Sequence, residues 1–202
     1  MYKIAAFITF NKKIEQKILS QKNKVKKKFG HQMYLDHPVH LTLFTITINK
    51  ITILKSLYKN LEKNLKQNKL TIKINKSGAF INDPLTNGHT LYYGIKNNKS
   101  LSSAQIKHLK IINKKLSVFK KYGYLFKNKT LKNNYKKYGF PFAGKIWIPH
   151  ITVASIKDIT KDHIFIKRFL KSKINLEYAA KDIKFYRVNN EKHHFLFKTN
   201  LF

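Results

Sequence analysis

The sequence predicts an α+β fold in which two pseudo-symmetric β-α-β-α-β-β half-repeats form a single bilobal domain over residues 1–202. Three observations predict it. Strand-like and helix-like segments alternate along the chain, and their order is the same in residues 1–88 and in residues 89–202. A His-x-Thr triplet also lies on the second predicted strand of each half, first in HLTLF and later in HITVA.

In residues 1–88, runs rich in β-branched and aromatic residues predict strands, and amphipathic runs predict helices. The strands are expected at residues 2–10, 39–48, 70–74 and 79–82. The first helix is expected at residues 11–29, where Ile14, Ile18 and Val25 form an apolar stripe. The second is expected after Thr52, whose hydroxyl can cap a helix with leucines spaced at three and four residues.

Residues 89–202 repeat this order with an insertion before the second motif. The strands are expected at residues 89–95, 146–156, 174–178, 183–188 and 195–201. One helix is expected to begin at Ser102 or Ser103, and another at Thr160. The two motifs lie 110 residues apart and the first strands of the two halves about 88, so the second half carries an insertion, assigned to residues 121–145.

The insertion mixes aromatic residues with lysines. Its aromatic residues are Tyr122, Tyr124, Phe126, Tyr135, Tyr138, Phe140 and Phe142. Such a mixture suits base stacking combined with attraction to phosphates. It equally suits a loop whose aromatic rings fold onto the core, and both interpretations stay open.

Composition favours an anionic ligand without identifying it. Lys and Arg total 42 against 9 Asp and Glu, which gives a formal net charge of +33. Cations that neutralise phosphates release counterions, so this surplus favours binding to nucleic acid. All but two of the basic residues are lysines, however, and the chain is also rich in Asn and Ile, which is typical of compositional drift.

Several classes of protein are excluded or disfavoured by what the chain lacks. It has no cysteine, which excludes disulfides and thiolate chemistry and removes the usual ligands of structural zinc. No segment approaches the roughly 20 apolar residues of a membrane-spanning helix. The N-terminal residues lack a signal-peptide cleavage pattern, so we expect a cytoplasmic protein that does not contact the membrane.

The two motifs place the same pair of functional groups on each strand. Residues i and i+2 of a strand point to the same face, so His40 projects with Thr42 and His150 projects with Thr152. The residues that point the other way, into the helical layer, are Leu41, Leu43, Ile151 and Val153. If the two halves pack about an approximate two-fold axis, both His-x-Thr pairs line one site.

A pair of histidines at one site suits phosphodiester chemistry. Histidine titrates near neutrality, so one imidazole can accept a proton from the nucleophile while the other gives a proton to the leaving oxygen. The threonine hydroxyls can donate hydrogen bonds to phosphoryl oxygens. Carboxylates are scarce and form no metal-binding pattern, so we expect no metal and no other cofactor.

HLTLF and PHITVAS, in a duplicated frame that covers essentially the whole chain, resemble the motifs of the 2H phosphoesterase superfamily, in particular its bacterial 2′-5′ RNA ligase and RNA cyclic phosphodiesterase branch. The resemblance implies antiparallel sheets lining a central cleft with helices outside. It also implies that His40 and His150 act as acid and base, in either order, and that Thr42 and Thr152 hold the phosphate. Substrates typical of such proteins are RNA or nucleotide 2′,3′-cyclic phosphates and 2′-5′ phosphodiester bonds.

Other residues receive more modest expectations. Contact with substrate is expected for Phe44, Tyr138, Phe140, Lys145 and Tyr186. The histidines expected in solvent, in loops or in turns are His31, His108, His163, His193 and His194. His37 is expected in a loop before Pro38, and the alternative is that it reaches the mouth of the cleft between the two motifs.

The functional hypothesis is therefore a metal-independent phosphodiesterase that acts as a monomer on RNA ends or nucleotide phosphodiesters. Two alternatives remain. A basic RNA-binding module without catalysis would bind RNA with a steep salt dependence and form no product. A 2′-5′ ligase of RNA ends would run the same chemistry in reverse.

Overall fold

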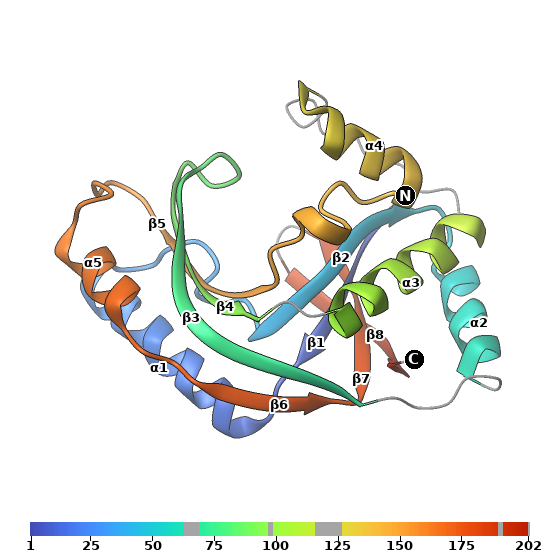
Figure 1. Ribbon diagram of the computed structural model, residues 1–202, viewed down its shortest axis with the longest axis horizontal. Helices are drawn as coiled ribbons and strands as arrows, with labels where there is room; N and C mark the ends of the chain where they lie inside the picture. The colour runs from blue at the N-terminus through green and yellow to red at the C-terminus, as the bar shows by residue number, and fades with distance from the viewer. Residues whose placement is uncertain (63–68, 97–98, 116–126, 190–191, 202) are drawn as a thin grey trace.

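The computed structural model describes residues 1–62, 69–96, 99–115, 127–189 and 192–201, and Figure 1 shows their arrangement. The elements follow one another in the order β1 (Tyr2–Thr9), α1 (Lys12–Phe29), β2 (His40–Ile48), α2 (Ile51–Glu62), β3 (Leu70–Asp83), β4 (Gly88–Ile95), α3 (Lys99–Lys115), α4 (Lys129–Tyr138), the 3-10 turn η2 (Gly144–Ile146), β5 (His150–Ile156), α5 (Ile164–Lys171), β6 (Leu176–Ala180), β7 (Asp182–Asn189) and β8 (Lys192–Asn200).

The strands form two four-stranded sheets in which every pair of neighbours is antiparallel. Sheet A has the order β2-β1-β7-β8, and sheet B has the order β5-β4-β3-β6. The expected α+β class with antiparallel sheets is confirmed. In both sheets the strand that begins with a motif histidine is an edge strand.

The two sheets do not follow the two halves of the sequence. Sheet A joins β1 and β2 to β7 and β8 from the C-terminal part of the chain, whereas β3 lies in sheet B beside β4. Each sheet therefore contains strands from both halves. Neither residues 1–88 nor residues 89–202 could complete a sheet alone.

β3 is a single strand of 14 residues, where two short strands at 70–74 and 79–82 were expected. Its first part pairs with β6 and its second part with β4, and Ile74 pairs with both; a register shift between Ile74 and Lys76 interrupts the ladder with β4. The polar stretch between the two expected strands thus remains in the sheet. Figure 1 shows the strong curvature of β3, which is typical of a strand that contains a bulge.

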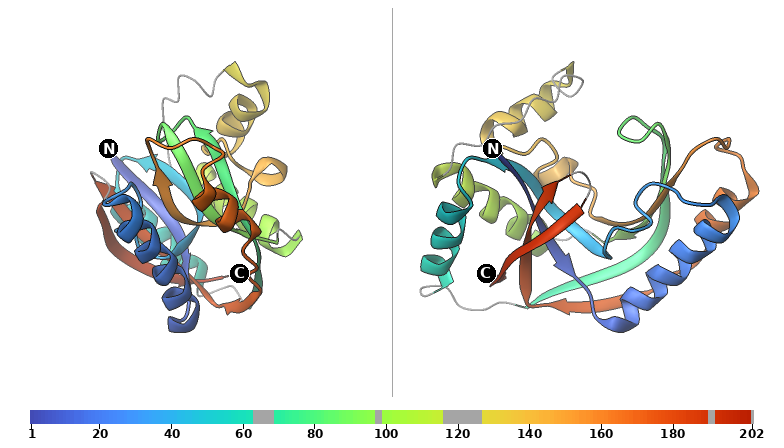
Figure 2. Two further views of the ribbon diagram at one scale, coloured as in Figure 1. Left: turned by 90° about the vertical axis from the view of Figure 1, so that its left-hand side faces the viewer. Right: turned by 180° about the vertical axis from the view of Figure 1, so that it is seen from behind.

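The helices lie on the outer faces of the sheets (Figures 1 and 2). α1 packs on β5 and α5 on β3, so these two helices cover sheet B. α2 packs on β8 and thus on sheet A, whereas α3 packs on β2 of sheet A and on β3 of sheet B. The helix that follows β1 thus crosses to the other sheet.

Three helices begin at positions that the sequence did not indicate. α2 begins at Ile51, so Thr52 lies inside the helix that it was expected to cap. α5 begins at Ile164 and not at Thr160, because Nδ1 of His163 accepts a hydrogen bond from the backbone N–H of Phe165 and caps the helix. α3 begins at Lys99, before the serines that were expected to cap it. The difference at α5 arises from capping, where several side chains compete for the same role.

The described part of the insertion contains α4 and η2. Asn128 caps α4, and Gly139 ends it in the left-handed conformation, with φ 68°. Tyr122, Tyr124 and Phe126, which were expected to contribute to the insertion, lie outside the described residues. Within the part of the chain that the structure describes, no helix is long and apolar enough to cross a membrane.

Candidate functional site

His40 and His150 are the first residues of β2 and β5, and these two edge strands lie next to each other where sheet A meets sheet B. Both imidazoles are partly exposed. The topology thus brings together the two strands that carry the motifs.

The same hydrogen bond orients each imidazole. Nδ1 of His40 lies 2.6 Å from the carbonyl oxygen of Pro38, and Nδ1 of His150 lies 2.7 Å from the carbonyl oxygen of Ile148. A carbonyl oxygen can only accept, so Nδ1 carries the proton and donates in both cases. This leaves Nε2 of each ring as the atom that can accept or give a proton at a ligand.

Thr42 and Thr152 are partly exposed, while the residues on either side of each are buried, as the alternation predicts. A bulge follows each threonine, because Leu43 and Val153 have no partner in the register of the neighbouring strand. A bulge lets two successive residues share one face of the sheet. The residue after each bulge, Phe44 in β2 and Ala154 in β5, is therefore buried like the residue before it.

Aromatic rings surround each histidine in corresponding positions. Phe7 of β1 is paired with Thr42 and stacks on His40 with ring centroids 3.7 Å apart. Tyr92 of β4 is paired with Thr152, and its ring centroid lies 5.2 Å from that of His150.

The next strand of each sheet adds one more ring. In sheet B, Phe80 lies 5.1 Å from His150 and 4.5 Å from Tyr92, measured between ring centroids. In sheet A, Tyr186 lies 5.2 Å from Phe7. Each half of the site thus consists of a histidine, a threonine and two aromatic rings on three neighbouring strands.

The surroundings of His40 favour its neutral form. Burial lowers its pKa to about 3, although the hydrogen bond to Pro38 opposes the change. Positive charge on His193, His37 and Lys22 would repel a proton on His40 and lowers the pKa further. At neutral pH this imidazole is uncharged and can accept a proton.

The surroundings of His150 differ in the sign of the nearby charge. Burial again lowers the pKa, and the hydrogen bond to Ile148 opposes this. The negative charge of Asp83 also raises the pKa of His150. The nearby charges therefore favour protonation of His150 and oppose protonation of His40.

Only one of the five further residues expected at substrate lies beside the motif residues. This is Tyr186, through its contact with Phe7. Phe44 has no exposed surface and packs against Phe185, so it belongs to the core and is not available to a ligand. The bulge explains this, because it turns Phe44 to the buried face together with Leu43.

The other three lie on or just after α4. Tyr138 ends the helix beside the ammonium of Lys137, Phe140 is buried against Phe142, and Lys145 is exposed in η2. Among the described residues, no ring contact or hydrogen bond joins these three to either motif histidine. Phe140 follows the alternative in which aromatic rings of the insertion fold onto the core.

Two histidines lie where the sequence did not suggest. His193 was expected in a turn or on the surface, but it belongs to β8 and its ring lies 5.9 Å from His40 and 4.7 Å from His37. His108 was expected in solvent but is fully buried, with Tyr58 Oη 2.9 Å from its Nδ1. A prediction that began the final strand a few residues earlier would have placed His193 on it. The contact between His193 and His40 could not be predicted in this way, because it depends on the order of the strands in sheet A.

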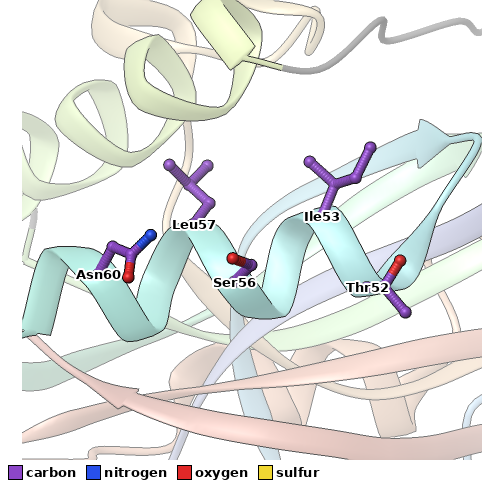
Figure 3. Close-up of a pocket in the computed structure, with 5 residues that line it drawn as sticks. All are labelled: Thr52, Ile53, Ser56, Leu57 and Asn60. Carbon is purple, nitrogen blue, oxygen red and sulfur yellow. The ribbon is translucent and has the colours of Figure 1, made fainter.

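The hollow shown in Figure 3 is separate from these histidines. It is formed along α2 by Thr52, Ile53, Ser56, Leu57 and Asn60. Within the described residues, no group of three or more His, Asp or Glu side chains is placed to hold a metal ion.

The fold of this chain is shared by several solved structures. It resembles a phosphoesterase at 14% identity and a TM-score of 0.59, over 99% of this chain and 98% of the other. It resembles TT0787 of Thermus thermophilus at 12% identity and a TM-score of 0.66, over 98% of this chain and 97% of the other. It resembles E. coli LigT complexed with 3′-AMP at 15% identity and a TM-score of 0.59, over 99% of this chain and 98% of the other.

The class of protein follows from a family match together with this fold, and it is the 2H phosphoesterase superfamily. Residues 2–199 match the family model of the AKAP7 2′5′ RNA ligase-like domain, and the chain belongs to that family. No curated protein is significantly similar to it in sequence.

Proposed function

We propose that the protein is a metal-independent phosphodiesterase that acts on 2′,3′-cyclic phosphates or 2′-5′ bonds of RNA or nucleotides. The observation that carries this proposal is the matched pair of histidines on adjacent edge strands, each with Nδ1 bonded to the carbonyl oxygen two residues earlier. Two imidazoles with free Nε2 atoms supply a base and an acid without a metal.

In this proposal, the threonine hydroxyls hold the phosphate and the histidines move the protons. Thr42 and Thr152 donate hydrogen bonds to the two nonbridging oxygens. The surplus of lysine attracts the polyanionic substrate. E. coli LigT has been solved with 3′-AMP and with NADP+, which supports a nucleotide as the ligand.

We assign His40 as the base and His150 as the acid. Burial and cationic neighbours keep His40 neutral, whereas at His150 the charge of Asp83 opposes the lowering of the pKa by burial, so His150 is the better of the two at carrying a proton. For a cyclic phosphate, Nε2 of His40 takes a proton from water while the water oxygen bonds to phosphorus. The bond from phosphorus to one ribose oxygen breaks, and Nε2–H of His150 protonates that oxygen. The product is a phosphate monoester, and both histidines return to their starting states by exchanging protons with solvent.

The test is turnover of a 2′,3′-cyclic nucleotide in EDTA. His40→Ala and His150→Ala should each lower kcat about 10²–10⁴-fold, as expected when a general base or acid is removed. His194→Ala is the matched control, because His194 is exposed on β8 next to the site. Full activity in either motif variant would disprove the mechanism. Salt-dependent RNA binding without product would support the non-catalytic alternative.

A further inference from the structure

Lys22 is a buried lysine on a helix whose other lysines are exposed. It lies on the apolar stripe of α1 together with Ile14, Ile18 and Val25 and is 3% exposed. The remaining seven lysines of α1 all face solvent. Burying a cation is costly unless its hydrogen bonds are satisfied, so Lys22 must have compensating partners.

Three backbone carbonyls supply this compensation. Nζ of Lys22 donates to the oxygens of Tyr34 at 2.6 Å, Leu35 at 3.2 Å and His37 at 2.6 Å. An ammonium has three donors, and each has an acceptor here. Burial lowers the pKa of Lys22 to about 8 and the charge of Asp36 raises it, so the ammonium form prevails at neutral pH.

The segment that Lys22 binds runs between the two motif strands. At its start, the carbonyl of Met33 accepts from Ser155 N–H at 3.0 Å, and Oε1 of Gln32 accepts from Lys157 N–H at 3.2 Å. Ser155 belongs to β5, three residues after Thr152. The start of the segment is therefore attached to the strand of the second motif.

The end of the segment holds the first motif histidine. Pro38 directly follows His37, whose carbonyl binds Lys22, and the carbonyl of Pro38 accepts the Nδ1–H of His40. Tyr34 has a φ of 73°, in the left-handed region that is unfavourable for a tyrosine. The hydrogen bond to Lys22 stabilises this conformation by holding the Tyr34 carbonyl.

We infer that Lys22 is a positioning residue that clamps residues 32–38 and thereby sets the orientation of His40 and its placement relative to β5. Only the expected effect on turnover rests on the proposed function. The effect of Lys22 on the orientation of the His40 imidazole can be measured without a substrate.

The primary experiment is nitrogen NMR of the histidine side chains in Lys22→Met. Met replaces the lysine stem but removes all three donors. The His40 signal should lose its pure Nδ1–H tautomer and show exchange between tautomers, whereas the His150 signal should stay as in the wild type. Lys24→Met, an exposed lysine of the same helix, is the control and should change neither signal. A folded Lys22→Met with an unchanged His40 signal overturns the inference.

A chemical rescue covers the case in which Lys22→Met does not fold. The chain has no cysteine, so Lys22→Cys introduces a single thiol. Alkylating it under denaturing conditions to an aminoethyl thioether restores an ammonium at nearly the original length. After refolding, the rescued protein should regain the Nδ1–H tautomer of His40, and failure to regain it in a folded protein overturns the inference.

Turnover gives a second readout. Misplacing the base should lower kcat of Lys22→Met about 10- to 100-fold with a smaller change in KM, and the rescued protein should recover. If His40→Ala proves fully active, the proposed function fails while the NMR result still stands. If the NMR signals do not change, the positioning role fails while the catalytic role of His40 still stands.

Discussion

The ring of Phe7 stacks on the imidazole of His40, with centroids 3.7 Å apart and planes inclined by 23°. At the other histidine the corresponding ring, Tyr92, is inclined by 58° to His150 with centroids 5.2 Å apart. The closer stacking means that Phe7 shields one face of His40 from water. Part of the burial that lowers the pKa of His40 therefore comes from this ring.

Phe7→Leu should consequently raise the pKa of His40 from about 3 towards its ordinary value of 6.5. A base must be unprotonated, and a higher pKa lowers the unprotonated fraction at any given acidic pH. The acidic limb of the kcat/KM profile, which lies near pH 3 in the wild type, should move to higher pH, as measured with a cyclic nucleotide over a pH range that extends below that value. Phe80→Leu, beside His150, is the matched comparison and should leave that limb in place. An unmoved limb in Phe7→Leu would contradict the assignment of His40 as the base.

Gly78→Ala should destabilise the protein and disturb Tyr92. A Cβ at position 78 would lie 2.5 Å from Cζ of the Tyr92 ring, so the ring would have to move away from its place beside His150. Overpacking of this kind costs about 1–3 kcal/mol in the free energy of unfolding, which urea denaturation measures. In a Tyr92→Leu background the same change should cost much less, because the ring is gone. Equal costs in both backgrounds would show that the ring does not limit the space at Gly78.

Acid should destabilise the fold through His108. Burial lowers the pKa of this histidine to about 3, below the ordinary value of 6.5 that applies in the unfolded chain. The unfolded state therefore binds the extra proton first, and the stabilisation present above pH 6.5 is lost as the pH falls towards 3. The contribution to the slope reaches about 1.4 kcal/mol per pH unit.

Urea denaturation at several pH values would measure this slope. His108→Leu should flatten the dependence between pH 6.5 and 3, although the variant will be less stable overall. His31→Leu is the control, because the His31 side chain is 68% exposed, and it should leave the slope as in the wild type. A His108→Leu slope identical to that of the wild type would contradict the prediction.

Local patterns were sufficient to predict the strands that carry the motifs. Runs rich in β-branched and aromatic residues predicted strands at residues 39–48 and 146–156, and β2 and β5 occupy most of these ranges. The buried and partly exposed residues around Thr42 and Thr152 also follow the alternation. This works because the side-chain direction in a strand depends on the local backbone alone.

The neighbours of the motif residues could not be predicted in the same way. Phe7, Tyr92 and His193 reach the histidines through the strand order and the pairing register, which depend on packing between distant segments. The burial of Phe44 depends on a bulge, which alternation does not reveal. Lys22 appeared as one lysine among many, because its burial depends on the loop that folds over it.

The exchange of strands between the two sheets has a consequence for biosynthesis. His40 is translated well before Tyr186 and His193, which lie around it and belong to β7 and β8. β1 needs β7 on its second edge, so sheet A cannot assume its final form until the residues of β7 and β8 have left the ribosome. The nascent chain must therefore carry β1 and β2 with an open edge until then, and such edges are prone to aggregation. The strands that carry Phe7 and His40 are thus synthesised first, but the sheet around them is the last to be completed.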